Sequence, residues 1–278
     1  MKISGIVLFN PDIVRLEENI TAIENQVDKL VLVDNGSNNI EEIRKKAASH
    51  TKVTLVENGE NLGIAVALNK IVLFAYEHGA EWVLTLDQDS VVYFELVLTY
   101  EKYVSEKNIG ILTCIIKDRN SSLLVSFDKS YKEVENCITS GSYTNVKACM
   151  ELGGFDEKMF IDYVDFDMCQ TMRKNGYKVL RINYVGVLHE VGKTRVVKFL
   201  GKEKNVYNHS PFRKYYIVRN HLYYIKKHKH HLDVVKEYFR LIKYILLVVI
   251  YEEQRIEKIK NIFKGISDSR KMQFSRKV

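Results

Sequence analysis

Apolar runs and helical periods alternate along the first 90 residues, with short polar breaks between them. Runs typical of buried strands cover Ile3–Phe9, Leu30–Val33, Val53–Val56 and Trp82–Leu86. Helical spacing lies between them, as in Ile13, Leu16, Ile20 and Ile23. Repeated strand and helix units whose strands are apolar throughout predict a mostly parallel sheet with helices on both faces. The predicted fold class is therefore α/β.

The pattern changes after residue 109. Short β-like stretches, which predict antiparallel additions to the sheet, lie at Ile109–Ile116, Leu123–Phe127 and Val134–Thr139. A helix is predicted over Tyr163–Lys174, and one more strand over Val179–Leu188. Helical periods return at about 209–228, 231–251 and 252–264. We therefore expect a sheet domain over residues 1–200 and a helical region over 201–278.

The formal charge of +7 is unevenly distributed. Residues 1–188 hold 20 Lys and Arg against 27 Asp and Glu, whereas residues 189–278 hold 22 against 8. Basic charge mixed with aromatic residues fits an anionic membrane or a nucleic acid. A nucleic-acid surface has no use for acidic loops at strand ends, so nucleic-acid binding is a distant alternative and no nucleic-acid partner is expected.

Cysteine usage and hydropathy predict a cytoplasmic protein. The four cysteines form no C-x-x-C pair, which disfavours a zinc site, and in a chain of this length they are typical of reduced thiols. The apolar stretch Ile3–Phe9 is too short for a signal peptide. The longest apolar run, Tyr244–Tyr251, is far below the roughly 20 residues of a membrane span.

Polar residues gather where three of the predicted strands end or the next helix begins. Asp87-Gln88-Asp89 follows one strand directly, and paired carboxylates suit Mg²⁺ or Mn²⁺. Asp34-Asn35-Gly36-Ser37 and Asn61-Leu62-Gly63-Ile64 each offer a helix N-terminus and a glycine, as nucleotide sites require. Taken singly, each also fits an ordinary turn or helix cap. Ligands of open α/β sheets bind at the carboxyl edge of the strands, which favours a shared site.

Acidic and imidazole groups recur later in the chain. Asp162, Asp165 and Asp167 crowd together, and if the helix begins near Asp162, their spacing places Asp162 and Asp165 on one face, where a carboxylate could be a general base. Acids at a helix N-terminus are equally favoured by the helix dipole. His189 follows the last predicted strand, and imidazole is an acceptable third ligand for Mn²⁺, although a lone His is more often structural.

In this order the motifs resemble glycosyltransferase family 2, inverting sugar-nucleotide transferases of the GT-A fold. The matching segments, spread over residues 3 to about 190, are Leu8-Phe9-Asn10-Pro11, Val33–Ser37, Asn61–Ala65, Leu86–Ser90, Gly153–Glu157 and Gly176-Tyr177-Lys178. A closer resemblance is to the bacterial rhamnosyltransferase branch, which builds O-antigen, capsule and cell-wall polysaccharides. Its segments here are Leu84–Ser90, Thr139–Ser142, Phe160–Asp165 and Arg213–Asn220.

The resemblance implies a donor site and a metal site. Asp34 would recognise the pyrimidine base, with Phe9 and Asn10 beside it, and Asn61 and Gly63 would line the nucleotide. Asp87 and Gln88 would lie near the ribose, with Asp87 also close to the metal. Asp89 would ligate the Mn²⁺ or Mg²⁺ that bridges the diphosphate, and His189 would be the additional ligand.

The resemblance also implies a catalytic base. Asp165 matches the family's catalytic aspartate, but Val164 stands where the family usually has Glu, so Asp162 and Asp167 remain secondary candidates. Arg219 and Asn220 would contact the diphosphate or the acceptor.

The expected reaction is inverting, metal-dependent transfer of L-rhamnose from dTDP-β-L-rhamnose to a saccharide or lipid-linked oligosaccharide. A UDP-hexose or UDP-galactofuranose is the alternative donor. A sugar-phosphate nucleotidyltransferase is disfavoured, because Ile6–Asp12 lacks the Gly-rich basic loop of those enzymes.

The basic C-terminal region predicts an amphipathic helix. Its apolar stripe, with Lys236, Arg240 and Lys243 beside it, consists of Phe239, Ile242, Leu246, Val249 and Ile250. Such a helix either lies on an anionic membrane, here the inner face of the plasma membrane, or packs against its own domain or a second subunit of a homodimer.

Overall fold

The computed structural model describes residues 1–119, 127–189, 195–199 and 201–274. The chain forms two compact units. The first consists of Met1–Phe160 and Val164–Glu190, and the second of Val191–Val278 together with three residues, Ile161–Tyr163. The division falls near residue 190, whereas the sequence places it near residue 200.

The first unit begins with four parallel strands, which are β1 (Ile3–Leu8), β2 (Lys29–Asp34), β3 (Val53–Glu57) and β4 (Trp82–Asp87). Their order in the sheet is β3-β2-β1-β4. All four predicted strands are confirmed to within one residue at each end. The carboxyl ends of β1, β2 and β4 therefore meet at one edge of the sheet, as the sequence pattern predicts.

The sheet continues with shorter and mixed strands, which are β5 (Val91–Val92), β6 (Ile109–Asp118), β7 (Tyr131–Glu133), β8 (Ser142–Asn145) and β9 (Lys178–His189). Beyond β4 the order is β8-β6-β9-β5, and β7 pairs with β9. Only β8 separates β4 from β6, and it is antiparallel to both, while β6 and β9 are parallel. Strands β4 and β9 therefore point the same way.

The strand predicted over Val134–Thr139 is wrong, because β7 and β8 lie on either side of it. Val134 N–H still donates to the Val179 carbonyl of β9 at 2.9 Å, but the Thr139 carbonyl accepts from the side chain of Thr85 at 2.7 Å and joins no ladder. The predicted strand Leu123–Phe127 lies outside the described residues except for Phe127. The predicted strands Ile109–Ile116 and Val179–Leu188 are confirmed within β6 and β9. The sequence predicts that the first of them is antiparallel in the sheet, and β6 is antiparallel to β8 but parallel to β9.

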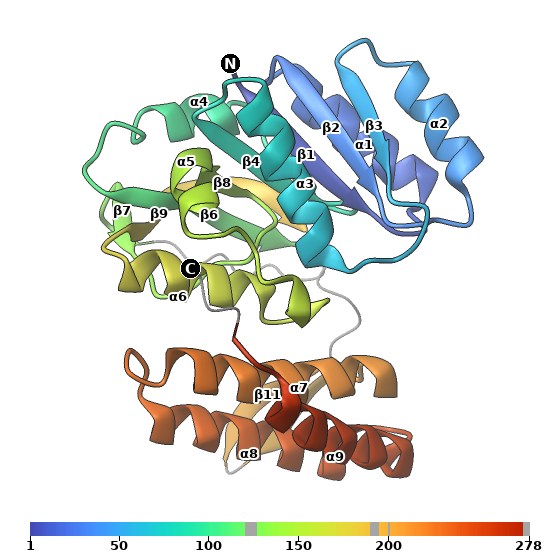
Figure 1. The fold of residues 1–278 in the computed structure, drawn as a ribbon, viewed down its shortest axis with the longest axis vertical. Coiled ribbons are helices and arrows are strands. Elements are labelled where there is room, and N and C mark those ends of the chain that lie inside the picture. The colour runs from blue at the N-terminus through green and yellow to red at the C-terminus, as the bar shows by residue number, and fades with distance from the viewer. Residues whose placement is uncertain (120–126, 190–194, 200, 275–278) are drawn as a thin grey trace. The chain divides into compact units, whose positions relative to one another are not determined.

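Helices cover both faces of the sheet (Figure 1). They are α1 (Ile13–Glu24), α2 (Ile40–Ala48), α3 (Ile64–Glu77), the short α4 (Leu96–Glu101) and α5 (Val146–Glu151), a 3₁₀ turn at Glu157–Met159, and α6 (Val164–Lys174). The even-numbered residues Ile6 and Leu8 of β1 pack in one core with Leu16 of α1. Gly5 faces the other way, where a Cβ atom would lie 2.4 Å from Ile71 of α3, so glycine permits the close approach of that helix.

The second unit contains a hairpin and three helices. Their bounds are β10 (Arg195–Phe199), β11 (Lys202–Val206), α7 (Pro211–His228), α8 (Val234–Tyr251) and α9 (Arg255–Lys271). The helices confirm the predicted helical region, whereas the hairpin was not predicted. The buried Glu252 carboxylate accepts from Lys214 at 2.6 Å and Lys258 at 2.9 Å, which joins α7 to α9. Within the described residues, none of the helices combines the length and the apolar character needed to cross a membrane.

We expect the stability of the first unit to depend on pH through His50. Its ring lies 2.7 Å from Glu24 and 3.2 Å from Glu17 of α1, and although burial lowers the His50 pKa, these two carboxylates raise it further, so the net pKa lies above the ordinary value. The protonated ring therefore stabilises the fold below about pH 6.5, and this contribution is lost as pH rises through the higher folded pKa. His50→Gln should cost about 0.5–1 kcal/mol of unfolding free energy at pH 5.5 and much less at pH 9. Urea unfolding at both values tests this, and an equal cost at both would contradict it.

Candidate active site

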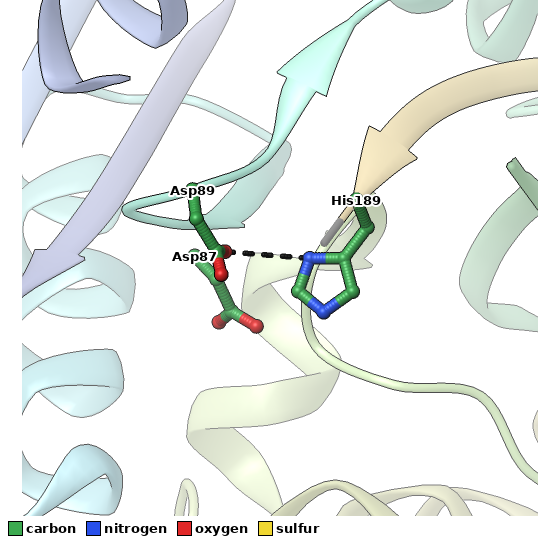
Figure 2. A group of neighbouring side chains, drawn as sticks. All are labelled: Asp87, Asp89 and His189. Carbon is green, nitrogen blue, oxygen red and sulfur yellow. Dashed lines mark ion pairs between the residues drawn. The ribbon is translucent and has the colours of Figure 1, made fainter. Parts of the chain in front are cut away.

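Asp87, Asp89 and His189 form a cluster at the carboxyl edge of the sheet (Figure 2). One ligand atom from each residue can be chosen so that all three lie within 4.8 Å of one another. Asp87 ends β4 and His189 ends β9, and because these strands point the same way, their last residues reach the same edge. The pairing of Val91 with Leu188 then fixes the Asp89-Ser90 turn beside His189. The three residues that the sequence assigns to the metal site are thus brought together.

The cluster is partly buried and electrically polarised. His189 Nδ1 lies 3.4 Å from Asp89 Oδ1, and the dashed line of Figure 2 marks this ion pair. Burial lowers the His189 pKa, but the charges of Asp89, Asp87 and Asp118 outweigh it, so that the pKa is raised overall. The Oδ1 atom of Asp89 is buried and accepts no hydrogen bond from the described residues. Two carboxylates, one of them with a buried oxygen that accepts no hydrogen bond from the described residues, and one imidazole fit a divalent cation.

Asp34 has one carboxylate oxygen that accepts hydrogen bonds and one that accepts none from the described residues. Its Oδ2 accepts from the backbone N–H groups of Gly36 at 2.9 Å and Ser37 at 3.0 Å. Asp34 is only 1% exposed, and its Oδ1 atom is buried and accepts no hydrogen bond from the described residues. A buried oxygen without a donor costs free energy unless a ligand supplies one. The N–H group of a pyrimidine base is such a donor.

The neighbouring strand ends are joined by side-chain bonds. The Gln88 side chain accepts from Phe9 N–H at 2.8 Å and donates to the Phe9 carbonyl at 3.3 Å, which ties β4 to β1. Asn10 N–H donates to Ser37 Oγ at 2.7 Å, and Asn10 Oδ1 accepts from Asn38 N–H at 2.8 Å. Three residues assigned to the donor site, Phe9, Asn10 and Gln88, therefore lie on connected loops beside Asp34.

The loop before α3 is closed by a neighbouring segment. Gly63 has φ +89°, and a Cβ atom there would lie within 3 Å of Phe160, so glycine is required by that contact. The first N–H of α3, from Ile64, donates to the Phe160 carbonyl at 2.7 Å. Asn61 Oδ1 accepts from Gly63 N–H at 3.0 Å, and the Asn61 side chain stays exposed. Asn61 therefore keeps a surface that a ligand can reach, whereas Gly63 packs against Phe160.

The three clustered aspartates differ in environment. Helix α6 begins at Val164 and not near Asp162, so Asp162 and Asp165 do not share a helix face. Asp162 and Tyr163 have positive φ values of 64° and 67°, which no α-helix accommodates. Asp165 is half-buried in the first turn of α6, and Asp167 is 2% exposed. Of the two acids on α6, Asp165 is the one that solvent reaches more readily.

Residues 161–163 are held by α7 within the second unit. Arg213 donates to both oxygens of Asp162, at 3.0 to 3.2 Å. The buried amide of Asn220 donates to the carbonyls of Ile161 at 2.7 Å and Asp162 at 3.0 Å. Tyr163 stacks on His221 with ring centroids 4.7 Å apart. Burial raises the pKa of Asp162 while Arg213 lowers it, with burial prevailing.

Arg219 and Asn220 are the two residues of α7 expected at the diphosphate or acceptor. Arg219 donates to Asn220 Oδ1 at 2.9 Å and lies 4.5 Å from the ring centroid of Tyr216. The Asn220 side chain is fully buried, so the described contacts assign it to the support of residues 161–163. Its role toward a ligand stays a prediction.

We expect Asn220→Ala to destabilise the protein by about 1–3 kcal/mol, because it removes a fully buried amide that donates to the carbonyls of Ile161 and Asp162. Urea unfolding measures this loss. Asn261→Ala is the matched control, since Asn261 also donates to a carbonyl, that of Glu257, but at an exposed place on α9. Equal stabilities of the two variants would contradict the prediction.

Three further residues near the cluster were not predicted as site residues. Asn19 of α1 is fully buried and donates to the Asp87 carbonyl at 2.8 Å. Ser90 and Ser140 are fully buried and bond to each other at 2.7 Å. A signal existed for Asn19, which lies at the same helical spacing as Leu16, Ile20 and Ile23 and is the polar residue on that apolar face. Nothing in the sequence indicates the pairing of the two serines.

Comparisons with known proteins agree with this geometry. Residues 6–142 match the family model for glycosyl transferase family 2. The chain is 29% identical to "dTDP-rhamnosyl transferase RfbF" of Shigella flexneri over 92% of its own length and 90% of that protein. It is also 31% identical to "Bifunctional glycosyltransferase pgtA" of Dictyostelium discoideum, but only over 35% of its length and 13% of that protein.

Solved structures share the fold. S. aureus TarS in complex with UDP-GlcNAc superimposes with a TM-score of 0.60 at 16% identity, over 97% of this chain and 80% of that one. GalNAc-T7 with UDP, GalNAc and Mn²⁺ gives 0.64 at 14% identity, over 97% of this chain and 54% of that one. These likenesses confirm the predicted GT-A fold. With the family match and a relative similar along nearly the whole chain, they lead to the conclusion that the protein is a glycosyltransferase with a family 2 domain over residues 6–142.

Proposed function

We propose that the protein transfers L-rhamnose from dTDP-β-L-rhamnose to a saccharide acceptor in the synthesis of a bacterial surface polysaccharide. The observation that carries the proposal is the Asp87, Asp89 and His189 cluster, at the same sheet edge as the unsatisfied Asp34 oxygen. A pyrimidine base at Asp34 and a diphosphate near the cluster together describe a pyrimidine nucleotide sugar. The similarity to a dTDP-rhamnosyl transferase over 92% of the chain favours rhamnose as the sugar.

The proposed reaction is a single displacement. Asp165 takes the proton of an acceptor hydroxyl, whose oxygen forms a bond to the anomeric carbon. The bond from that carbon to the diphosphate oxygen breaks on the opposite face, so dTDP leaves and the configuration inverts. Asp34 holds the base during the reaction, and Gln88 fixes the end of β1 beside it.

The cluster would hold Mn²⁺ or Mg²⁺ through Asp89 and His189, with Asp87 close by. A divalent cation supplies positive charge against the negative charge that develops on the leaving diphosphate. The His189 ring is already oriented by its hydrogen bond with Ser90, so the ring would need little reorientation when the cation binds.

A thermal-shift screen with Mn²⁺ tests the donor, because a ligand that binds the native state raises its melting temperature. We expect a larger shift with dTDP-rhamnose than with UDP-glucose or UDP-galactofuranose at equal concentration. Transfer of labelled rhamnose to an acceptor extract, with release of dTDP, then tests the reaction. A larger shift with a UDP-sugar, together with transfer of that sugar, would replace rhamnose by the alternative donor.

We further propose that α8 contacts an anionic lipid surface at the cytoplasmic face of the plasma membrane, where a lipid-linked acceptor would be found. Five apolar residues on one side of α8 are exposed, from 44% at Leu246 to 67% at Phe239; they are Val235, Phe239, Ile242, Leu246 and Ile250. Val249, expected in this stripe, is half-buried instead. The opposite side of α8 packs through Leu241 and Val248 into the core of the second unit.

A cluster of lysines lies next to this stripe. The Lys243 pKa is lowered, first by desolvation and then by the charges of Lys204 and Lys202 from β11. Three neighbouring ammonium groups repel a second copy of the same surface and attract phosphate head groups, which favours a membrane over a homodimer.

Co-sedimentation with vesicles tests the lipid surface. We expect binding to phosphatidylglycerol vesicles that weakens in 0.5 M NaCl, and little binding to phosphatidylcholine. Ile242→Glu/Leu246→Glu should abolish it, whereas Leu98→Glu, which changes a similarly exposed leucine of α4, should not. Loss of a dimer by light scattering in the double variant, with vesicle binding absent in the wild type, would assign the stripe to a second subunit instead.

A further inference from the structure

Two buried serines connect the residues of the Asp87, Asp89 and His189 cluster. The Asp87 N–H donates to Ser140 Oγ at 3.1 Å, and Ser140 Oγ–H donates to Ser90 Oγ at 2.7 Å. Ser90 Oγ is hydrogen-bonded to His189 Nδ1 at 2.8 Å. Both serines are fully buried, so these bonds do not compete with bulk solvent. A continuous path of three hydrogen bonds therefore runs from the backbone of Asp87 to the ring of His189.

This path connects the ends of two strands that are not neighbours in the sheet. Strand β4, which ends in Asp87, and strand β9, which ends in His189, are separated in the sheet by β8 and β6. No backbone ladder joins β4 and β9 directly, and the nearest backbone link is the pairing of Val91 of β5 with Leu188 of β9, four residues after Asp87. Ser140 lies just before β8 and bonds toward both sides, to Asp87 directly and to His189 through Ser90.

The backbone around Ser140 is fixed independently of its hydroxyl. Thr85 Oγ1 donates to the Thr139 carbonyl at 2.7 Å, and Gly141 N–H donates to the Thr85 carbonyl at 2.8 Å. The hydroxyl of Tyr100 donates to the Gly141 carbonyl at 2.5 Å. Removal of the Ser140 hydroxyl should therefore leave this loop in place and break mainly the hydrogen bonds that lead to His189.

We propose that Ser140 and Ser90 are positioning residues that set the distance and ring orientation of His189 relative to Asp87, and so preorganise the cluster for a divalent cation. The proposal rests on the cation site of the proposed function and adds two residues to it. Hydrogen-bond partners of a metal-binding histidine fix its ring and tautomer, and their loss typically weakens metal affinity by about 10- to 100-fold. Neither serine needs to touch the cation, the donor or the acceptor.

Mn²⁺ titration followed by electron paramagnetic resonance, without donor or acceptor, tests the proposal on the full chain. We expect Ser140→Ala and Ser90→Ala each to weaken Mn²⁺ binding by about tenfold. Because the two hydroxyls act in series, the double variant should be weakened by clearly less than the product of the two single effects. Melting temperatures in EDTA verify that the variants are folded.

Ser142→Ala is the matched control. Ser142 is 3% exposed and lies two residues from Ser140, but its hydroxyl donates to the Ile138 carbonyl and not toward the cluster. We expect its Mn²⁺ affinity to equal that of the wild type. Wild-type affinity in Ser140→Ala and Ser90→Ala, or an equal loss in Ser142→Ala, would overturn the positioning role while leaving the cation site intact. A wild-type protein that binds no divalent cation and transfers sugar in EDTA would overturn the cation site itself and this inference with it.

Discussion

Asp165→Asn should reduce sugar transfer by about 10²- to 10⁴-fold, because an amide cannot take the proton of the acceptor hydroxyl. The substitution preserves the local structure, since the amide oxygen can still accept the 2.9 Å bond from Phe166 N–H. Donor binding should therefore remain near the wild-type level. Steady-state transfer rates, together with calorimetric titration of the donor in the presence of Mn²⁺, measure the two quantities separately.

The neighbouring acids serve as controls for Asp165. Asp162→Asn removes a carboxylate that Arg213 holds, and Asp167→Asn changes one that is 2% exposed. Both should lower stability more than they lower the rate of the folded enzyme. If Asp165→Asn transferred sugar at nearly the wild-type rate while Asp162→Asn or Asp167→Asn did not, the base would have to be reassigned to that residue.

Asp89→Asn should weaken both divalent-cation affinity and sugar transfer, the former by at least about tenfold. The variant loses a negative charge that faces His189 at 3.4 Å and an oxygen that has no other hydrogen-bond partner among the described residues. Donor affinity should fall as well, because the diphosphate loses the cation that offsets its charge. Mn²⁺ titration and donor calorimetry report these effects on the same samples.

Asp118→Asn is the control for charge alone. Asp118 also acts on the His189 pKa through its charge, yet it is outside the three-residue cluster. Its cation affinity should change much less than that of Asp89→Asn. Treatment with EDTA should abolish wild-type transfer, and Mn²⁺ or Mg²⁺ should restore it. Transfer that is indifferent to EDTA would count against a metal role for Asp89.

The parallel half of the sheet could be predicted because its strands are apolar throughout and end in polar residues. A strand such as β2, buried along nearly its whole length, carries a signal that periodicity detects. The segment from 130 to 145 could not be predicted in the same way. Strands β7 and β8 have three and four residues, too few for a pattern. At the end of Val134–Thr139, the carbonyls of Ile138 and Thr139 accept from the side chains of Ser142 and Thr85 and not from a neighbouring strand.

The same contrast holds for the site. Asp34, Asp87 and Asp89 could be placed together because they lie at the carboxyl ends of predicted parallel strands, and the family resemblance adds His189 to them. Asp162 could not, because its left-handed backbone is stabilised by Arg213 and Asn220, which are 51 and 58 residues further along the chain. The sequence predicts the helix over Tyr163–Lys174, and it begins one residue later, at Val164. The shared face of Asp162 and Asp165 required a start near Asp162, which the left-handed backbone there rules out. The serine path has the same origin, since Ser90 and Ser140 meet across 50 residues.

The capture of residues 161–163 by α7 also sets an order for folding during synthesis. Asp162 leaves the ribosome well before Arg213, and at roughly 5–20 residues per second the delay is on the order of several seconds. During this time the first unit has its parallel strands but not the partners that hold the turn before α6. The bonds from Arg213 and Asn220 to residues 161 and 162 can form only after α7 has emerged, so a chain that stalls or is cut before α7 should retain the sheet and lack these bonds.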